Sequence, residues 1–163
     1  METERHNPWQ VGTAGHAPRV VALLRGPYLA ALAQIHAQLQ ATFPDLRPAH
    51  FIVFQLIEHP PAGSRLTELA QPAQMTKPAM LELVDALERG GYVERHPDPV
   101  DRRAKLIRLT SRGVEAYACG LQAVDQIEAA WTQSLGDERF AQLVALLRDL
   151  AALGGGLTAR APD

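Results

Sequence analysis

The sequence predicts a mainly α-helical protein with one small β-hairpin, for three reasons. Residues 76–89 have the cap, the apolar spacing and the terminating glycines of an α-helix, and a shorter helical stretch precedes them. Two short runs with β-branched and aromatic residues follow, separated by a Pro- and Asp-rich loop that suits a hairpin. The flanking segments carry apolar residues at helical spacing. This order predicts a winged helix-turn-helix flanked by N- and C-terminal dimerisation helices.

The N-terminal part should contain two long helical segments. From Pro18 to Thr42 an apolar stripe recurs at helical spacing, and Gly26-Pro27 should kink this helix or start a new one. Pro48 opens a second helix through Glu58, which is so dense in apolar residues that we expect it to be buried on most sides.

The next two helices form the predicted helix-turn-helix. The first is a short stretch from Ser64 to Ala70, which the segment Gln71 to Met75 interrupts. The second begins directly after Thr76, because the Thr76 hydroxyl can accept from a free amide of the first turn and Pro78 costs little there. Gly90-Gly91 ends this helix. Its buried stripe comprises Met80, Leu83, Val84 and Leu87.

The predicted hairpin, or wing, consists of the strand-like runs 92–96 and 104–109, and its charge differs from that of the helices before it. From Arg95 to Arg112 the chain has six basic and two acidic residues, a balance of plus four (6 − 2). From Arg65 to Gly91 it has three basic residues against four acidic ones. If this module binds DNA, the wing must therefore provide most of the attraction for phosphates.

Two further helices should follow the wing. Ser111 can cap a long amphipathic helix, and Gly136 breaks that helix before Asp137 caps a last one. With the first helix of the chain, these helices have more apolar surface than a small module can cover, so we expect a two-fold homodimer. Its two recognition helices would lie one DNA turn apart, about 10 bp, and face a pseudo-palindromic operator.

The segment from Leu66 to Gly113 resembles the MarR (multiple antibiotic resistance regulator) family of transcription factors. The matching pieces, in chain order, are Leu66-Thr-Glu-Leu-Ala70, Leu83-Val-Asp-Ala-Leu-Glu88, Gly91-Tyr-Val-Glu-Arg95, Asp101-Arg-Arg103 and Leu109-Thr-Ser-Arg-Gly113. The Asp-Arg-Arg and Leu-Thr-x-x-Gly pieces at this spacing are a specific signal. The flanking helices fit the family layout too, so the resemblance covers roughly residues 18–153.

The resemblance implies a dimeric, sequence-specific DNA-binding regulator, most often a repressor, that a small aromatic or phenolic effector releases from DNA. It implies that Arg102 or Arg103 reaches into the minor groove, while Asp101 pairs with a nearby arginine and holds the wing tip in shape. Lys105 adds to the basic wing. The helix residues that would face the major groove are Thr76, Lys77, Pro78 and Leu81.

The sequence departs from the family pattern on the recognition helix. Many members have arginine or a small polar residue where this chain has Glu82 and Ala86. A carboxylate can accept a hydrogen bond from the amino group of cytosine, but it repels phosphates. An alternative function therefore stays open, a winged-helix protein-interaction or sensor module with weak or lost DNA binding.

Few residues suggest other chemistry. His36, Phe54 and Tyr117 could line the cleft in which MarR-like proteins hold effectors. The histidines and the single Cys119 show no metal-ligand spacing, and Cys119 suits helix packing better than redox sensing. Nucleophile-elbow, P-loop and dinucleotide fingerprints are absent, so the sequence predicts neither an enzyme nor a cofactor.

The composition predicts a small regulator that does not interact with membranes. The chain has 163 residues, of which 47% are hydrophobic, and a net charge of −2. No stretch approaches the roughly 20 apolar residues of a bilayer span, the first residues do not resemble a signal peptide, and one cysteine fits a reducing compartment, so we expect a cytoplasmic protein. The expected parts are a flexible tail (1–17), an N-terminal dimerisation helix (18–47), a winged helix-turn-helix DNA-binding domain (48–110), C-terminal dimerisation helices (111–153) and a second flexible tail (154–163).

Overall fold

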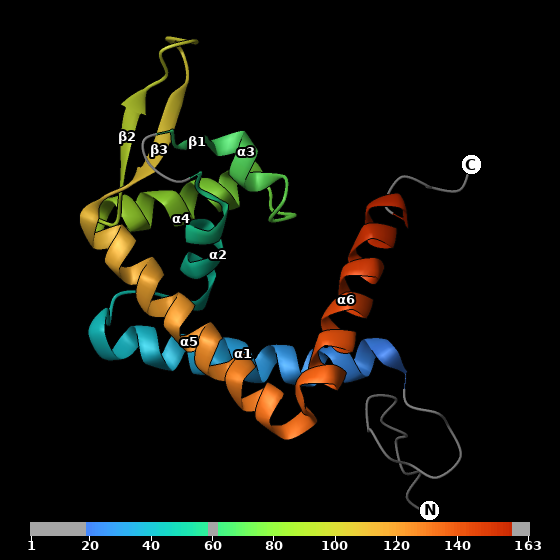
Figure 1. Cartoon of the computed structure of the whole chain (residues 1–163). Coiled ribbons are helices and arrows are strands. Elements are labelled where there is room, and N and C mark those ends of the chain that lie inside the picture. Colours follow the sequence, from blue (N-terminus) through green and yellow to red (C-terminus); the bar gives the residue numbers. More distant parts are fainter. Residues whose placement is uncertain (1–18, 59–61, 158–163) are drawn as a thin grey trace, which may run out of the picture. The chain divides into compact units, whose positions relative to one another are not determined.

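The computed structural model describes residues 19–58 and 62–157, and within 154–157 it describes the backbone alone. The described residues form six helices and three short strands (Figure 1). In chain order these are α1 (Val20–Thr42), α2 (Pro48–Leu56), β1 (Ser64–Arg65), α3 (Leu66–Ala70), α4 (Lys77–Arg89), β2 (Val93–Pro97), β3 (Lys105–Leu109), α5 (Ser111–Leu135) and α6 (Asp137–Leu157). The prediction of a mainly helical protein with a small β element is confirmed. The predicted tail 1–17 lies outside the described residues.

The chain divides into two compact units, and the division falls inside α5, after Ala123. The first unit contains the winged helix-turn-helix, and its core is formed by side chains from α2, α4 and the hairpin that are at most 2% exposed, among them Phe54, Met80, Val84, Leu87, Tyr92 and Ile107. The C-terminal part of α1 belongs to the same core, because Ile35 and Leu39 are buried. In the second unit, α6 exposes large apolar side chains, namely Leu143, Leu146, Leu147, Leu150 and Leu153.

The sheet has three antiparallel strands in the order β1-β3-β2, one more than the sequence predicted. Ser64 pairs with Ile107 and Arg65 with Leu106, so residues 64–65 extend the wing instead of starting a helix. The chain can enter β1 because Gly63 has φ +80°, and a Cβ there would lie 2.8 Å from the Ile107 carbonyl oxygen. The helix then begins at Leu66, where the Glu68 carboxylate accepts from the Arg65 backbone N–H at 2.8 Å.

Helix α4 has the bounds that the sequence predicts. The Thr76 hydroxyl accepts from the Ala79 N–H at 3.3 Å, which confirms the N-cap. At the other end, the Tyr92 N–H donates to the Leu87 carbonyl and the Gly91 N–H to the Glu88 carbonyl, and Gly91 has φ 73°. These two bonds form a Schellman motif, which ends the helix and turns the chain into β2.

The long helices differ from the prediction in detail. The sequence left two alternatives at Gly26-Pro27, and the start of a new helix is wrong, because a single helix, α1, runs through Pro27; residues 25–30 are exposed. Helix α2 ends at Leu56, two residues before the predicted end. Helix α6 continues to Leu157, beyond the predicted boundary at 153.

Helix α1 is also long and apolar enough to cross a membrane by length and composition alone. This corrects the prediction that no segment approaches such a span. A count of consecutive apolar residues missed it because a few polar side chains interrupt an otherwise apolar helix. The same composition suits a helix that another protein surface covers, and Ile35 and Leu39 are already buried in the first unit.

The caps of α5 and α6 lie one residue earlier than predicted. Thr110, not Ser111, caps α5, since its hydroxyl accepts from the Gly113 N–H at 3.1 Å. The same hydroxyl donates to the Gly91 carbonyl at 2.6 Å, which ties the start of α5 to the end of α4. Gly136 precedes α6 with φ 83°, and its carbonyl accepts from the Phe140 N–H, so Asp137 lies within the first turn.

A polar cluster joins the α1–α2 loop to the start of β2 and of α5. The Tyr92 hydroxyl donates to Asp45 Oδ1 at 2.6 Å and accepts from Arg112 Nη2 at 2.9 Å. The Arg112 guanidinium also lies over the Tyr92 ring, 4.6 Å from its centroid. Burial and the hydrogen bond to Asp45 raise the pKa of Tyr92, so the phenol stays protonated and holds these three elements together.

Candidate nucleic-acid interface

The exposed side of α4 carries the four residues that were predicted to face the major groove. Thr76, Lys77 and Pro78 are exposed, and Leu81 is 42% exposed in spite of its apolar side chain. The opposite side of the helix is fully buried at Met80, Val84 and Leu87. The helix is therefore fixed along one side and presents its first turns to solvent, as a helix that enters a DNA groove must.

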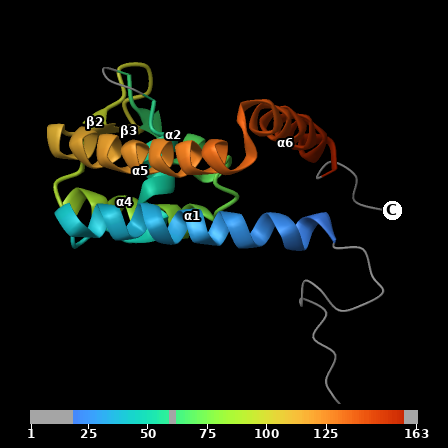
Figure 2. The same ribbon diagram turned by 60° about the horizontal axis from the view of Figure 1, so that its bottom comes forward.

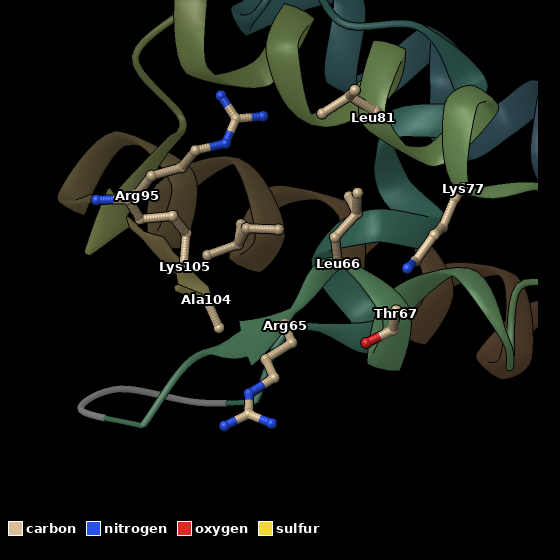
Figure 3. A pocket seen from close by; sticks show the side chains of 9 residues that line it. Arg65, Leu66, Thr67, Lys77, Leu81, Arg95, Ala104 and Lys105 are labelled. Carbon is tan, nitrogen blue, oxygen red and sulfur yellow. The ribbon is translucent and has the colours of Figure 1, made fainter. Parts of the chain in front are cut away.

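Beside this face lies a hollow of about 320 Å³ between α3, α4 and the sheet (Figure 3). Its lining residues come from three parts of the chain and are Arg65, Leu66, Thr67, Lys77, Leu81, Arg95, Ala104, Lys105 and Ile107. The hollow brings together Lys77 and Leu81 of the helix with Lys105 of the wing, which the sequence placed in separate groups. The sequence singled out none of the other six as binding residues, although Arg65 and Arg95 were visible as charges.

Arg95 of β2 pairs with two of the three carboxylates of α4 and cancels one of their two negative charges. Its Nη2 lies 2.5 Å from Asp85 Oδ1, and its Nη1 donates to Glu88 Oε2. The Arg95 side chain is only 25% exposed, so this ion pair is partly shielded from water. The acidic balance of the helix is therefore smaller than the residue count suggests, and Arg95 contributes less to the free charge of the wing.

Asp98 organises the wing tip. This carboxylate is 4% exposed, and its Oδ2 accepts from Arg65 Nε at 2.7 Å and lies 2.5 Å from Arg65 Nη2. Its Oδ1 accepts from the backbone N–H groups of Val100, at 2.8 Å, and Asp101, at 3.3 Å. The Val100 hydrogen bond, helped by Arg65, holds the pKa of Asp98 below its usual value, so the group is ionised at neutral pH.

Asp101 does not form the predicted ion pair. Its Oδ1 accepts from the Arg103 backbone N–H at 3.0 Å, and its carbonyl accepts from the Ala104 N–H at 2.9 Å. Asp101 thus shapes the tip through a tight turn, and Asp98 makes the arginine pair because it faces Arg65 of β1. The side chains of Arg102 and Arg103 are exposed at the tip and form no ion pair within the residues that the structure describes.

The three residues predicted to line an effector cleft have different environments. Phe54 is completely buried, with its ring centroid 6.1 Å from that of Tyr92, so it cannot line an open cleft. His36 Nε2 lies 3.3 Å from the Leu46 carbonyl oxygen, and the Tyr117 ring lies 6.0 Å from that of Phe51. The sequence did not reveal the burial of Phe54, because an apolar aromatic residue suits a cleft wall and a core equally.

Helix α1 approaches the first half of α5 at Cys119, whose Sγ lies 4.0 Å from the Gln38 carbonyl oxygen; Figure 2 shows the two helices one above the other. Cys119 is half-buried in this helix contact. Across residues 19–58 and 62–157, no group of three His, Cys, Asp or Glu side chains is placed to hold a metal ion.

Comparisons with known proteins give one consistent result. The model of the MarR family matches residues 47–105. The transcriptional regulator HosA of Escherichia coli O111:H- is 28% identical over 114 residues, which are 70% of this chain and 84% of that protein.

Solved structures agree with this match. A crystal structure of MarR has a TM-score of 0.76 at 21% identity and covers 91% of this chain and 99% of its own, which shows the shared fold. The transcriptional repressor CouR bound to a 23-mer DNA duplex has a TM-score of 0.67 at 27% identity, covering 82% and 92%. CouR from Rhodococcus jostii RHA1 bound to p-coumaroyl-CoA has a TM-score of 0.66 at 26% identity, covering 81% and 91%.

Proposed function

Because the chain belongs to the MarR family of transcriptional regulators, we propose that it is a dimeric, sequence-specific DNA-binding repressor that a small-molecule effector releases from its operator. Its relatives are regulators rather than enzymes, in agreement with the sequence-based prediction. A regulator of this kind works where the genome is, in the cytoplasm.

The observation that carries this proposal is the arrangement of unpaired cations. Arg65 pairs with Asp98, Arg95 with Asp85 and Glu88, and Arg112 with Asp45. In the part of the chain that the structure describes, four basic side chains of α4 and the wing form neither a hydrogen bond nor an ion pair, namely Lys77, Arg102, Arg103 and Lys105. These four lie around the exposed face of α4 and along the wing, where DNA phosphates would neutralise them.

The recognition helix and the wing would bind two different grooves. Thr76, Lys77, Pro78 and Leu81 face the major groove, while Arg102 or Arg103 enters the minor groove, where the potential is most negative. Lys105 lies between the two and contacts a phosphate, and Asp101 holds the turn that presents the arginines. The DNA-binding domain then corresponds to residues 48–110.

The dimer would form through α1 and the C-terminal helices, residues 18–47 and 111–153. The N-terminal half of α1 has large apolar side chains that are 41–75% exposed, namely Val20, Val21, Leu23, Leu24, Tyr28 and Leu29. Single exposed apolar residues are normal on a protein surface, but α1 and α6 each expose several large ones. A second copy of the chain would cover them. Two recognition helices would then face a pseudo-palindromic operator.

An effector would act by a population shift. It would favour a dimer in which the two recognition helices are wrongly spaced for the operator, so that DNA affinity falls. Structures of CouR support the presence of both kinds of partner, since one contains a 23-mer DNA duplex and another contains p-coumaroyl-CoA. A small aromatic or phenolic compound is the expected ligand class, with His36 and Tyr117 as the candidate contacts that remain.

The test is a fluorescence titration of labelled DNA from the promoter beside the protein's own gene, repeated at several salt concentrations. We expect affinity to fall steeply with salt. The double variant Arg102→Ala/Arg103→Ala should weaken binding. It should also make the slope of log binding constant against log salt concentration shallower, by about one unit for each phosphate that the variant no longer neutralises. The matched control Arg19→Ala/Arg25→Ala removes the same charge at α1, which lies across the unit from the wing (Figure 1). Sedimentation checks that both variants remain dimers.

If the wing variant binds DNA as tightly as the control, with the same salt dependence, the wing assignment is wrong. If the unchanged protein binds neither this promoter nor any sequence selected from random DNA, the alternative of an interaction or sensor module with lost DNA binding is favoured instead.

A further inference from the structure

The recognition helix has one acidic group that the structure leaves free. Of the three carboxylates on α4, Asp85 and Glu88 are held by Arg95. Glu82 is exposed and has no hydrogen bond or ion pair within the described residues. No basic residue lies three or four positions from it along the helix, where a side-chain partner would have to be.

Glu82 lies on the side of α4 that faces away from the core. Pro78, Glu82, Asp85 and Arg89 follow one another at intervals of four, three and four residues, which places them on one stripe of the helix. The buried stripe of Met80, Val84 and Leu87 lies on the opposite side. Since Pro78 and Leu81 are also exposed, Glu82 stands among the residues of the first two turns that would meet base edges.

The chemistry of a free carboxylate restricts what it can contact there. An ionised glutamate only accepts hydrogen bonds, so a DNA phosphate repels it and a base must provide the donor. In the major groove, cytosine presents the donor N4–H₂, whereas guanine presents only acceptors and adenine has its N7 acceptor next to its donor. Cytosine is therefore the base whose edge fits a carboxylate.

We propose that Glu82 is a specificity-determining residue that reads a cytosine in the major groove of each half-site. This inference rests on the proposed function, and it explains why Asp85 and Glu88 are paired while Glu82 is not. Arg95 holds Asp85 and Glu88 and offsets one of their two negative charges, which would otherwise repel the backbone, and it leaves Glu82 as the carboxylate that is free to read a base. Affinity then comes from Lys77 and the wing, and discrimination from Glu82.

The experiment is a selection of bound sequences from a random DNA pool with the full-length protein, Glu82→Ala, Glu82→Gln and the control Glu115→Gln. Glu115 is exposed on α5, so its variant loses the same charge away from α4. Alanine and glutamine are good helix formers, and thermal unfolding checks that each variant stays folded. The selected site is then titrated with each of the four base pairs at the preferred position.

We expect the unchanged protein and Glu115→Gln to prefer cytosine at one position of each half-site, by roughly 10- to 100-fold over other bases. Glu82→Ala should lose this preference at that position alone. Glu82→Gln should shift it toward adenine, because an amide can both donate to N7 and accept from N6–H₂.

The inference is overturned if both Glu82 variants select the same bases as the unchanged protein. In that case a uniform gain of affinity for all sequences would mean that the carboxylate only repels phosphates. If the unchanged protein enriches no sequence at all, the proposed function fails together with this inference, so the two failures are distinguishable.

Discussion

The substitution Gly113→Ala tests how α5 is joined to the wing. Gly113 lies in the first turn of α5, and a Cβ at this position would lie 2.0 Å from the Tyr92 carbonyl oxygen. Ordinary van der Waals separation begins at 3.4 Å, so the two backbones would have to separate by about 1.4 Å (3.4 − 2.0). The Tyr92 carbonyl cannot move freely, because it accepts from the Thr110 N–H at 3.0 Å and because residue Tyr92 is only 1% exposed.

The expected loss of stability follows from this geometry. Overpacking of a tight site costs about 1–3 kcal/mol, and breaking the Thr110–Tyr92 hydrogen bond costs about 1–3 kcal/mol more. Alanine regains about 1 kcal/mol over glycine within a helix. The net effect is a destabilisation of about 3 kcal/mol, a large share of the roughly 5–15 kcal/mol that hold a typical domain folded.

Urea unfolding, followed by circular dichroism, measures this difference. The control is Ala118→Gly, a position of the same helix, which should lose only about 1 kcal/mol through helix propensity. If Gly113→Ala proves as stable as the unchanged protein, or more stable, the close approach of α5 to Tyr92 does not exist in solution.

Two further substitutions probe titrating groups. Asp98→Asn should loosen the wing tip and reduce stability at neutral pH. The folded pKa of Asp98 lies below its unfolded value of about 3.8, so the stability that it gives is present above that pH and lost as pH falls through the folded pKa. The free energy of unfolding of the variant should therefore fall less in acid than that of the unchanged protein. His50 is 3% exposed, and its Nδ1 accepts from the Arg47 N–H at 3.0 Å. Burial lowers the pKa of His50 below 6.5, so the unfolded chain takes up a proton first and stability falls as pH drops below about 6.5. His50→Asn keeps an acceptor and should remove this fall between pH 7 and 5, whereas an unchanged slope would assign it to another group.

Local signals predicted the recognition helix and the hairpin well. The hydroxyl of Thr76 and the left-handed Gly91 set the ends of α4, and both act on neighbours within a few residues. The Leu-Thr-x-x-Gly piece has a physical basis that became visible only in the structure. Thr110 caps α5, and Gly113 allows the close approach to Tyr92.

Interactions between distant parts of the chain were not predictable in the same way. Strand β1 has two residues, and its partners in β3 lie more than forty positions away, so no local pattern marks it as a strand. Asp98 and Asp101 are both near the wing tip, and only the position of Arg65 decides which of them forms the ion pair. The same holds for Arg95, which lies in the wing along the sequence, whereas in the fold its guanidinium pairs with Asp85 and Glu88 of α4.

The sequence by itself determined the order of the helices, the ends of α4, the hairpin and the family, because caps, glycines and apolar periodicity act between near neighbours. The tertiary structure decided which charges are free to meet DNA. An ion pair depends on which side chains the folded chain brings within a few ångströms, and in this protein Arg65 pairs with Asp98 while Arg95 pairs with Asp85 and Glu88. Among the described residues of α4 and the wing, Glu82, Lys77, Lys105, Arg102 and Arg103 remain unpaired.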